Sequence, residues 1–81
     1  MFTMLDKLVE DVYYVFDEDI IAKIKGDVLY LTDTRVNSYA NFETLEDSLQ
    51  DVFDYIVNKY NVDLDVLDMN RRTVALEVIT Y

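Results

Sequence analysis

The chain has 81 residues, 52% of them hydrophobic, and its 17 acidic residues outnumber 7 basic ones to give a net charge of −10. We expect one small acidic domain over residues 1–81, because the apolar content is too high for a disordered tail. Histidine and cysteine are absent and glycine occurs once, which excludes histidine acid–base chemistry, thiolate nucleophiles, disulfides and glycine-rich phosphate loops. A metal-dependent hydrolase is the one enzyme class left, and we expect neither a catalytic residue, nor a cofactor, nor a bound metal.

The charge also limits the partners. A net charge of −10 opposes direct contact with nucleic acid or anionic lipid and favours a basic protein partner. No stretch approaches the roughly 20 apolar residues of a membrane span, and the first residues lack the pattern of a secretory signal. With no cysteine present, these features predict a cytoplasmic protein, in the host cytoplasm if the source is viral.

The first predicted element is an amphipathic helix from about Thr3 to Phe16. Apolar residues recur at helical spacing and predict one buried face. The acidic run at residues 17–19 follows, and three carboxylates at the negative end of the helix dipole favour fraying there. The predicted buried face consists of Leu5, Leu8, Val9, Val12, Val15 and Phe16.

A hairpin comes next. Residues 20–25 and 28–32 alternate in polarity on either side of Gly26 and Asp27, and glycine at the first central position favours a type II′ turn. This turn fixes the register and leaves one face wholly apolar and the other mixed. The expected pairs are Ile24–Leu29 and Ala22–Leu31 on the apolar face, with Lys25–Val28, Lys23–Tyr30 and Ile21–Thr32 on the mixed face.

The second half repeats this order. A polar connection at residues 33–41 precedes a helix from about Phe42 to Tyr60, capped by Asn41 or Thr44. Its predicted buried face consists of Phe42, Leu45, Leu49, Val52, Phe53, Ile56 and Tyr60.

The last predicted element is a hairpin with a three-residue loop at residues 69–71. A two-residue loop would set Asp65 opposite Leu76 and mix the faces, so we favour the longer loop, although it opposes Asp63 to Glu77. The expected pairs are Val66–Val74, Leu64–Leu76 and Val62–Val78.

Together these elements predict an α+β fold in the order α-β-β-α-β-β. We expect a two-layer sandwich in which two amphipathic helices lie on one face of a four-stranded, mostly antiparallel sheet. The strand order stays open.

Acidic residues concentrate on the two predicted helices. Residues 1–19 carry six acids and one base, and residues 42–60 carry five acids and one base. Successive acids such as Asp47 and Asp51 stand about 6 Å apart along a helix, which resembles the spacing of phosphates on a nucleic-acid strand. These faces are either ordinary solvated surfaces or a surface for a basic partner. The candidate partner-binding residues are Glu43, Glu46, Asp47, Asp51, Asp54, Asp6, Glu10 and Asp11.

In size, acidity and lack of cysteine and proline, the chain resembles the compact inhibitors that viruses and mobile elements make against nucleic-acid-processing enzymes, such as anti-restriction and anti-CRISPR proteins. The resemblance covers charge and size alone. It implies a non-enzymatic inhibitor, similar to a DNA mimic, that docks on a basic nucleic-acid-binding protein.

The alternative function rests on the sheet. If helices cover one side, the other side exposes many apolar groups for so small a chain, which indicates a structural or assembly module that forms a homodimer. The acids at residues 63–68 and 17–19 lack the spacing of a metal site. We expect the few basic residues to form ion pairs with neighbouring acids. The candidate self-association residues are Ile21, Val28, Tyr30, Leu67, Ile79 and Tyr81, beside Lys23 and Lys25.

Overall fold

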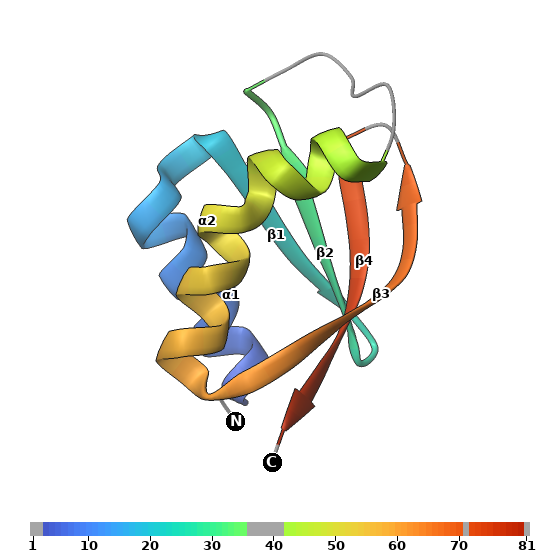
Figure 1. Cartoon of the computed structure of the whole chain (residues 1–81). Helices are drawn as coiled ribbons and strands as arrows, with labels where there is room; N and C mark the ends of the chain where they lie inside the picture. The colour runs from blue at the N-terminus through green and yellow to red at the C-terminus, as the bar shows by residue number, and fades with distance from the viewer. Residues whose placement is uncertain (1–2, 36–41, 71, 81) are drawn as a thin grey trace.

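The computed structural model describes residues 3–35, 42–70 and 72–80, without the side chains of residues 42–46. In this part of the chain, two helices lie on one face of a four-stranded antiparallel sheet, which confirms the α+β fold and the element order (Figure 1). The strand order is β1-β2-β4-β3, so the two hairpins join through β2 and β4.

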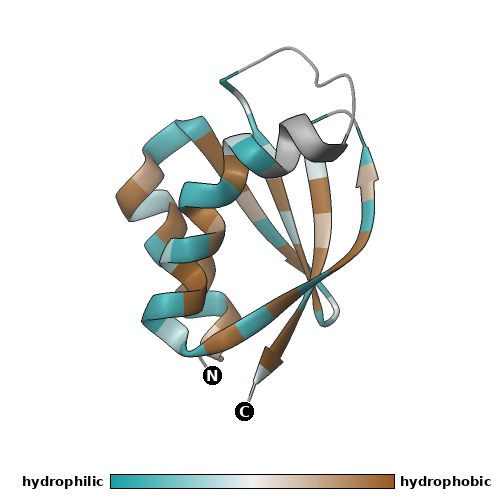
Figure 2. Cartoon of the chain, in the orientation of Figure 1, coloured by the Kyte–Doolittle hydropathy of each residue, from teal (hydrophilic) through white to brown (hydrophobic). Residues whose placement is uncertain are grey.

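The first helix, α1 (Met4–Phe16), begins as the sequence predicts. Thr3 caps it, because its hydroxyl accepts from the Asp6 N–H at 3.2 Å while the Asp6 carboxylate accepts from the Thr3 N–H at 3.1 Å. Leu8 and Val12 are fully buried, but Val15 is 49% exposed in the last turn, so its predicted place in the buried face is wrong. The helix alternates between apolar and polar bands (Figure 2).

The chain leaves α1 through a short 3-10 turn, η1 (Asp17–Asp19), and enters the first hairpin. Strands β1 (Ile20–Lys25) and β2 (Val28–Asp33) pair in the predicted register throughout. Gly26 has a φ of 64° and Asp27 is not among the residues with positive φ, which is the combination that a type II′ turn requires.

The second helix, α2 (Phe42–Tyr60), has the predicted bounds. Leu49, Val52 and Ile56 are fully buried, while the side chains of Phe42 and Leu45, like the predicted caps Asn41 and Thr44, lie outside the described residues. Asn61, with a φ of 54°, follows directly, and asparagine in this left-handed conformation is a common way to end a helix.

The second hairpin differs from the prediction. Strands β3 (Val62–Asn70) and β4 (Thr73–Thr80) pair Leu64 with Val78 and Val66 with Leu76, two residues away from the expected register. Residue Asn70 pairs with Thr73, which leaves a two-residue connection, and a bulge between Val66 and Asp68 absorbs one residue. The bulge keeps the apolar side chains on one face, so the argument against a two-residue loop fails.

The core lies between the helices and the inner face of the sheet. We call inner the face that carries Leu29, Leu31, Val74 and Leu76, all fully buried, and outer the face that no described helix covers. The remaining buried core residues are Leu8, Val12, Ile20, Leu49, Val52, Ile56 and Val62.

Candidate functional site

A hollow in the described part of the chain lies between the C-terminal half of α1, η1 and the edge strand β1. It has a volume of about 1050 Å³, an apolar floor and an acidic rim. We call it the acidic groove, and its lining consists of Val9, Glu10, Asp11, Tyr13, Tyr14, Asp17, Glu18, Asp19, Ile20, Ile21, Ala22 and Thr34.

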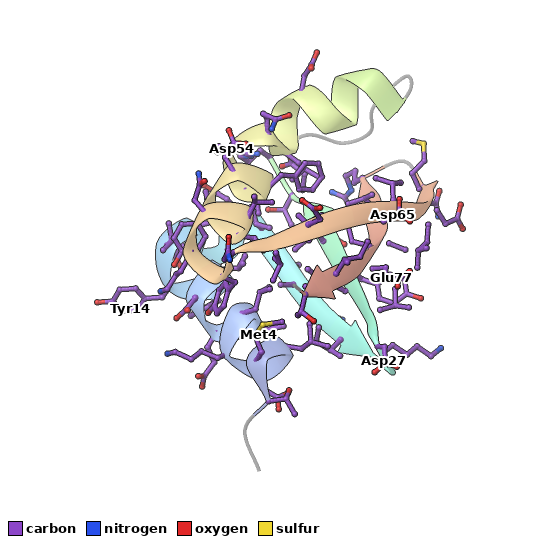
Figure 3. The ribbon with its side chains drawn as sticks, turned by 60° about the horizontal axis from the view of Figure 1, so that its bottom comes forward. Met4, Tyr14, Asp27, Asp54, Asp65 and Glu77 are labelled. Carbon is purple, nitrogen blue, oxygen red and sulfur yellow. The ribbon has the colours of Figure 1, made fainter. Side chains whose placement is uncertain are left out.

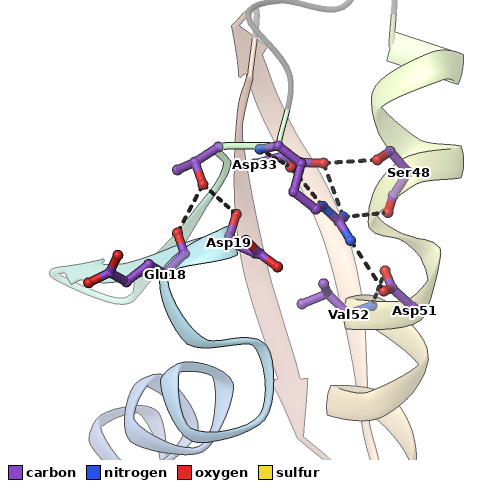
Figure 4. Close-up of polar contacts among 8 residues, drawn as sticks. Glu18, Asp19, Asp33, Ser48, Asp51 and Val52 are labelled. Carbon is purple, nitrogen blue, oxygen red and sulfur yellow. Dashed lines mark hydrogen bonds and ion pairs between the residues drawn. The ribbon is translucent and has the colours of Figure 1, made fainter.

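The local sequence explains the acidic rim. The chain must turn between α1 and β1, and it does so with three acids whose side chains are all exposed. Thr34, directly after β2, holds this turn in place through hydrogen bonds to Glu18 and Asp19, which Figure 4 labels. Its hydroxyl lies 2.9 Å from the carbonyl oxygens of Glu18 and Asp19, and its N–H donates to the Asp19 carbonyl at 2.9 Å. The backbone of the turn is therefore fixed while its carboxylates face solvent.

Two neighbouring tyrosines add aromatic surface to the groove. Tyr13 is 61% exposed and Tyr14 is 89% exposed, and Tyr14 extends away from the body of the molecule (Figure 3). The face of an aromatic ring attracts a cationic side chain, and nearby carboxylates reinforce that attraction. The groove is suited to lysine and arginine side chains.

The structure separates the predicted partner-binding acids on α1. Glu10 is exposed on the rim of the acidic groove. Asp6 caps the helix, and its hydrogen bonds with Thr3 lower the pKa of its carboxyl. Asp11 also lines the groove, but its side chain is only 15% exposed and is held by other residues.

Asp11 links the two helices. It accepts a hydrogen bond from the Tyr60 hydroxyl, and the Lys59 ammonium lies 2.9 Å from its carboxylate. The Tyr60 bond and then the Lys59 bond lower the pKa of Asp11, and the Asp11 bond raises the pKa of Lys59. Burial and then the Asp11 bond raise the pKa of Tyr60 to about 12. Asp11 therefore has a structural role.

The predicted acidic row on α2 is interrupted. Asp47 and Asp54 are exposed, and Asp54 accepts a hydrogen bond from Gln50 at 2.8 Å. Asp51 forms an ion pair with Arg35 at 3.6 Å. The side chains of Glu43 and Glu46 lie outside the described residues. The row is not a continuous line of unpaired carboxylates over its described length.

A buried carboxylate, Asp33, joins the end of β2 to α2 (Figure 4). Asp33 is fully buried and lies 3.0 Å from the Arg35 side chain, and the Ser48 hydroxyl donates to it at 2.9 Å. Arg35 also donates to the Ser48 carbonyl at 2.9 Å. The sequence placed Asp33 in a polar connection, which is wrong, whereas the expected pairing of Arg35 with acids is confirmed.

Most of the predicted self-association residues lie on the outer face of the sheet. The strand register places Ile21, Val28, Tyr30 and Ile79 there. Ile21 is 43% exposed and Ile79 is 40% exposed. Leu67, which is 50% exposed, forms the bulge of β3, and Tyr81 lies outside the described residues.

Sequence reasoning missed part of the acidic groove. The acids at residues 17–19 were considered only as a fraying helix end and as metal ligands, and Tyr13 was not singled out. A run of acids directly after an amphipathic helix, next to paired tyrosines, was the available signal. Its proximity to β1 depends on the turn geometry that Thr34 holds.

Other signs of function are few. No group of three or more acids is placed to hold a metal ion within residues 3–35, 42–70 and 72–80, and no helix there is long and apolar enough to cross a membrane. No protein-family model matches the chain, and comparison with curated proteins and with solved structures finds no significant similarity.

Proposed function

We propose that this protein is a non-enzymatic binding protein whose acidic groove takes a basic segment of a partner protein. The observation that carries the proposal is the groove itself, where four exposed carboxylates and two exposed tyrosines surround an apolar floor. The carboxylates are those of Glu10, Asp17, Glu18 and Asp19.

The groove offers three kinds of contact to a basic segment. The carboxylates pair with lysine or arginine, and their combined field attracts a cationic partner over a distance. The rings of Tyr13 and Tyr14 stack against cationic side chains. Strand β1 is an edge of the described sheet, so its outward N–H and C=O groups can pair with an extended backbone.

The partner class follows from this chemistry. Proteins that bind nucleic acid carry clustered lysine and arginine, and occupation of such a cluster by the acidic groove would exclude their phosphate ligand. The protein would then act as an inhibitor of the DNA-mimic kind, through the groove more than through α2, where Asp51 is already paired with Arg35. A cytoplasmic location, which the lack of cysteine favours, belongs to the same proposal.

The test uses a short fluorescent peptide of alternating arginine and serine and measures anisotropy at physiological salt. The groove variant E10Q/E18Q/D19N removes three charges from the rim. The control variant D27N/D47N/D54N removes three charges elsewhere, so both variants have the same net charge. We expect the groove variant to weaken binding about tenfold and the control to change it less than about twofold.

Equal losses in the two variants would contradict the proposal, because they would show attraction to net charge without a site. A larger loss in the control would also contradict it, and would place the binding surface outside the groove. Tyr14→Ala provides a check that leaves the charge unchanged. It should weaken binding severalfold if the aromatic ring contacts the peptide.

A further inference from the structure

The outer face of the sheet has a regular arrangement of charge. The register of the strands sets side chains of this face into rows that cross all four strands. Each row begins with a lysine on β1, passes through uncharged side chains on β2, and ends with an aspartate on β3. The two rows are Lys25–Val28–Glu77–Asp65 and Lys23–Tyr30–Ala75–Asp68.

The charges at the two ends of these rows are not neutralised by neighbouring residues of the same chain. Lys23 and Lys25 are exposed and have no ion-pair partner in the described part of the chain, so the expected pairing of bases with neighbouring acids is wrong for these two lysines. At the other end, Asp65 lies directly opposite Glu77, and both side chains are exposed on the same side (Figure 3). A like-charged cross-strand pair is unfavourable unless a cation approaches it.

We propose that a second copy of this chain covers the outer face and forms a symmetric dimer. A twofold axis parallel to the strands, between β2 and β4, places β1 of each copy over β3 of the other. Lys25 then lies over the Asp65–Glu77 pair of the second copy, and Lys23 lies over its Asp68. Each ion-pair contact occurs twice, because the interface is the same patch on both copies.

The charge pattern selects this axis. A twofold axis in the same plane but across the strands would place β1 over β1, and thus lysine over lysine, with aspartate over aspartate at the other edge. Like charges in such positions oppose association. Between the charged edges, the chosen arrangement brings Tyr30 of one copy over Ala75 of the other, so an aromatic ring meets a small side chain near the axis.

The expected dimer is weak. With strands about 4.8 Å apart and about 3.3 Å per residue, four strands over a length of six residues cover roughly 400 Å² on each copy, below the area of a standard stable interface. The net charge of −10 also opposes association at low salt. At physiological ionic strength, where the Debye length is about 8 Å, distant acids are screened and the direct pairs remain. The proposal does not depend on the acidic groove, whose charged rim lies on α1 and η1.

The first test measures molecular mass by sedimentation equilibrium over a range of concentrations, with circular dichroism as the control for folding. The wild-type chain should change from monomer to dimer as its concentration rises. The variants K23D/K25D and D65K/D68K should each raise the dissociation constant at least about tenfold. An equal mixture of the two should associate again, because every lysine then faces an aspartate.

A wild-type chain that stays monomeric up to millimolar concentration overturns the proposal. So does a dimer that both charge variants leave unchanged, since it must use another surface. If a charge variant fails to fold, disulfide capture decides, because the natural chain has no cysteine. Mixed K25C and D65C proteins should form a disulfide between the two variants faster than K25C alone forms its own. Faster K25C self-linkage would show the crossed axis and contradict the proposal.

Discussion

The two faces of the sheet belong to the same strands but differ in burial and in the pairing of their charged side chains. On the inner face, Leu29 and Leu31 are fully buried under the helices, whereas Val28 and Tyr30, their neighbours on β2, are only half-buried on the outer face. The inner face contains one buried charge, Asp33, with several partners, among the described residues. On the outer face, Lys23, Lys25 and Asp65 have no ion-pair partner among the described residues. The buried contacts that stabilise the fold therefore lie on the inner face, whereas the outer face is accessible to another molecule.

The largest expected effect contrasts two aliphatic residues of opposite faces. Leu31→Ala should lower the free energy of unfolding by about 3 kcal/mol, because it leaves a cavity in a closed core. Ile21→Ala on the outer face should lower it by less than about 1 kcal/mol. Urea unfolding at low protein concentration measures both. Similar losses would show that the outer face also contributes to the core.

The next effect concerns the buried charge. Asp33→Asn keeps the shape but removes the charge that faces Arg35, and we expect a loss of about 2 kcal/mol in the free energy of unfolding. Asp65→Asn on the outer face is the control, and it should be neutral or slightly stabilising because it relieves the Asp65–Glu77 repulsion. A destabilising Asp65→Asn variant would indicate that this aspartate already has a partner within the chain.

A smaller effect depends on pH. Tyr60→Phe removes the hydrogen bond to Asp11 and should cost about 1 kcal/mol at neutral pH. Because folding raises the pKa of Tyr60 to about 12, the stability from its neutral form is complete below about pH 10 and is lost as the pH rises through about 12. The lowered pKa of Asp11 has the opposite sign, so its stabilisation is lost as the pH falls through the folded-state value.

Unfolding measured across pH should therefore show the two proteins converging at both extremes and differing most near neutrality. A constant difference at every pH would mean that the Tyr60 hydroxyl is not coupled to Asp11. Asp27→Asn, in the hairpin turn, is a control that removes one acid far from the helices.

The smallest expected effect tests the β-bulge. Deletion of Leu67 leaves Val66 and Asp68 adjacent, with Val66 still on the inner face and Asp68 on the outer face. Since the alternation is preserved, we expect the melting temperature to change by only a few degrees. NMR contacts across the hairpin should retain the pairs Val66–Leu76 and Met69–Val74. A shift of these pairs would show that the bulge sets the register of β3.

Much of the fold was readable from the sequence, because local signals were strong. Helical spacing gave the extent of α1, and the single glycine gave the turn of the first hairpin. The register of the second hairpin was not readable. Over Val62–Val66 the two registers differ by two residues, which keeps each side chain on its own face, so polarity could not distinguish them, and no glycine marked the turn.

The candidate sites, like the fold, depend partly on local sequence and partly on contacts between distant segments. The sequence by itself determined the excess of acids and their concentration near the helices. Only the tertiary structure assigned Asp11 to a contact between the helices, placed η1 beside β1 to form the acidic groove, and paired β2 with β4. That last pairing joins lysines from one hairpin and aspartates from the other into common rows. Local patterns report which face a residue occupies, whereas neighbours distant in sequence depend on packing between elements.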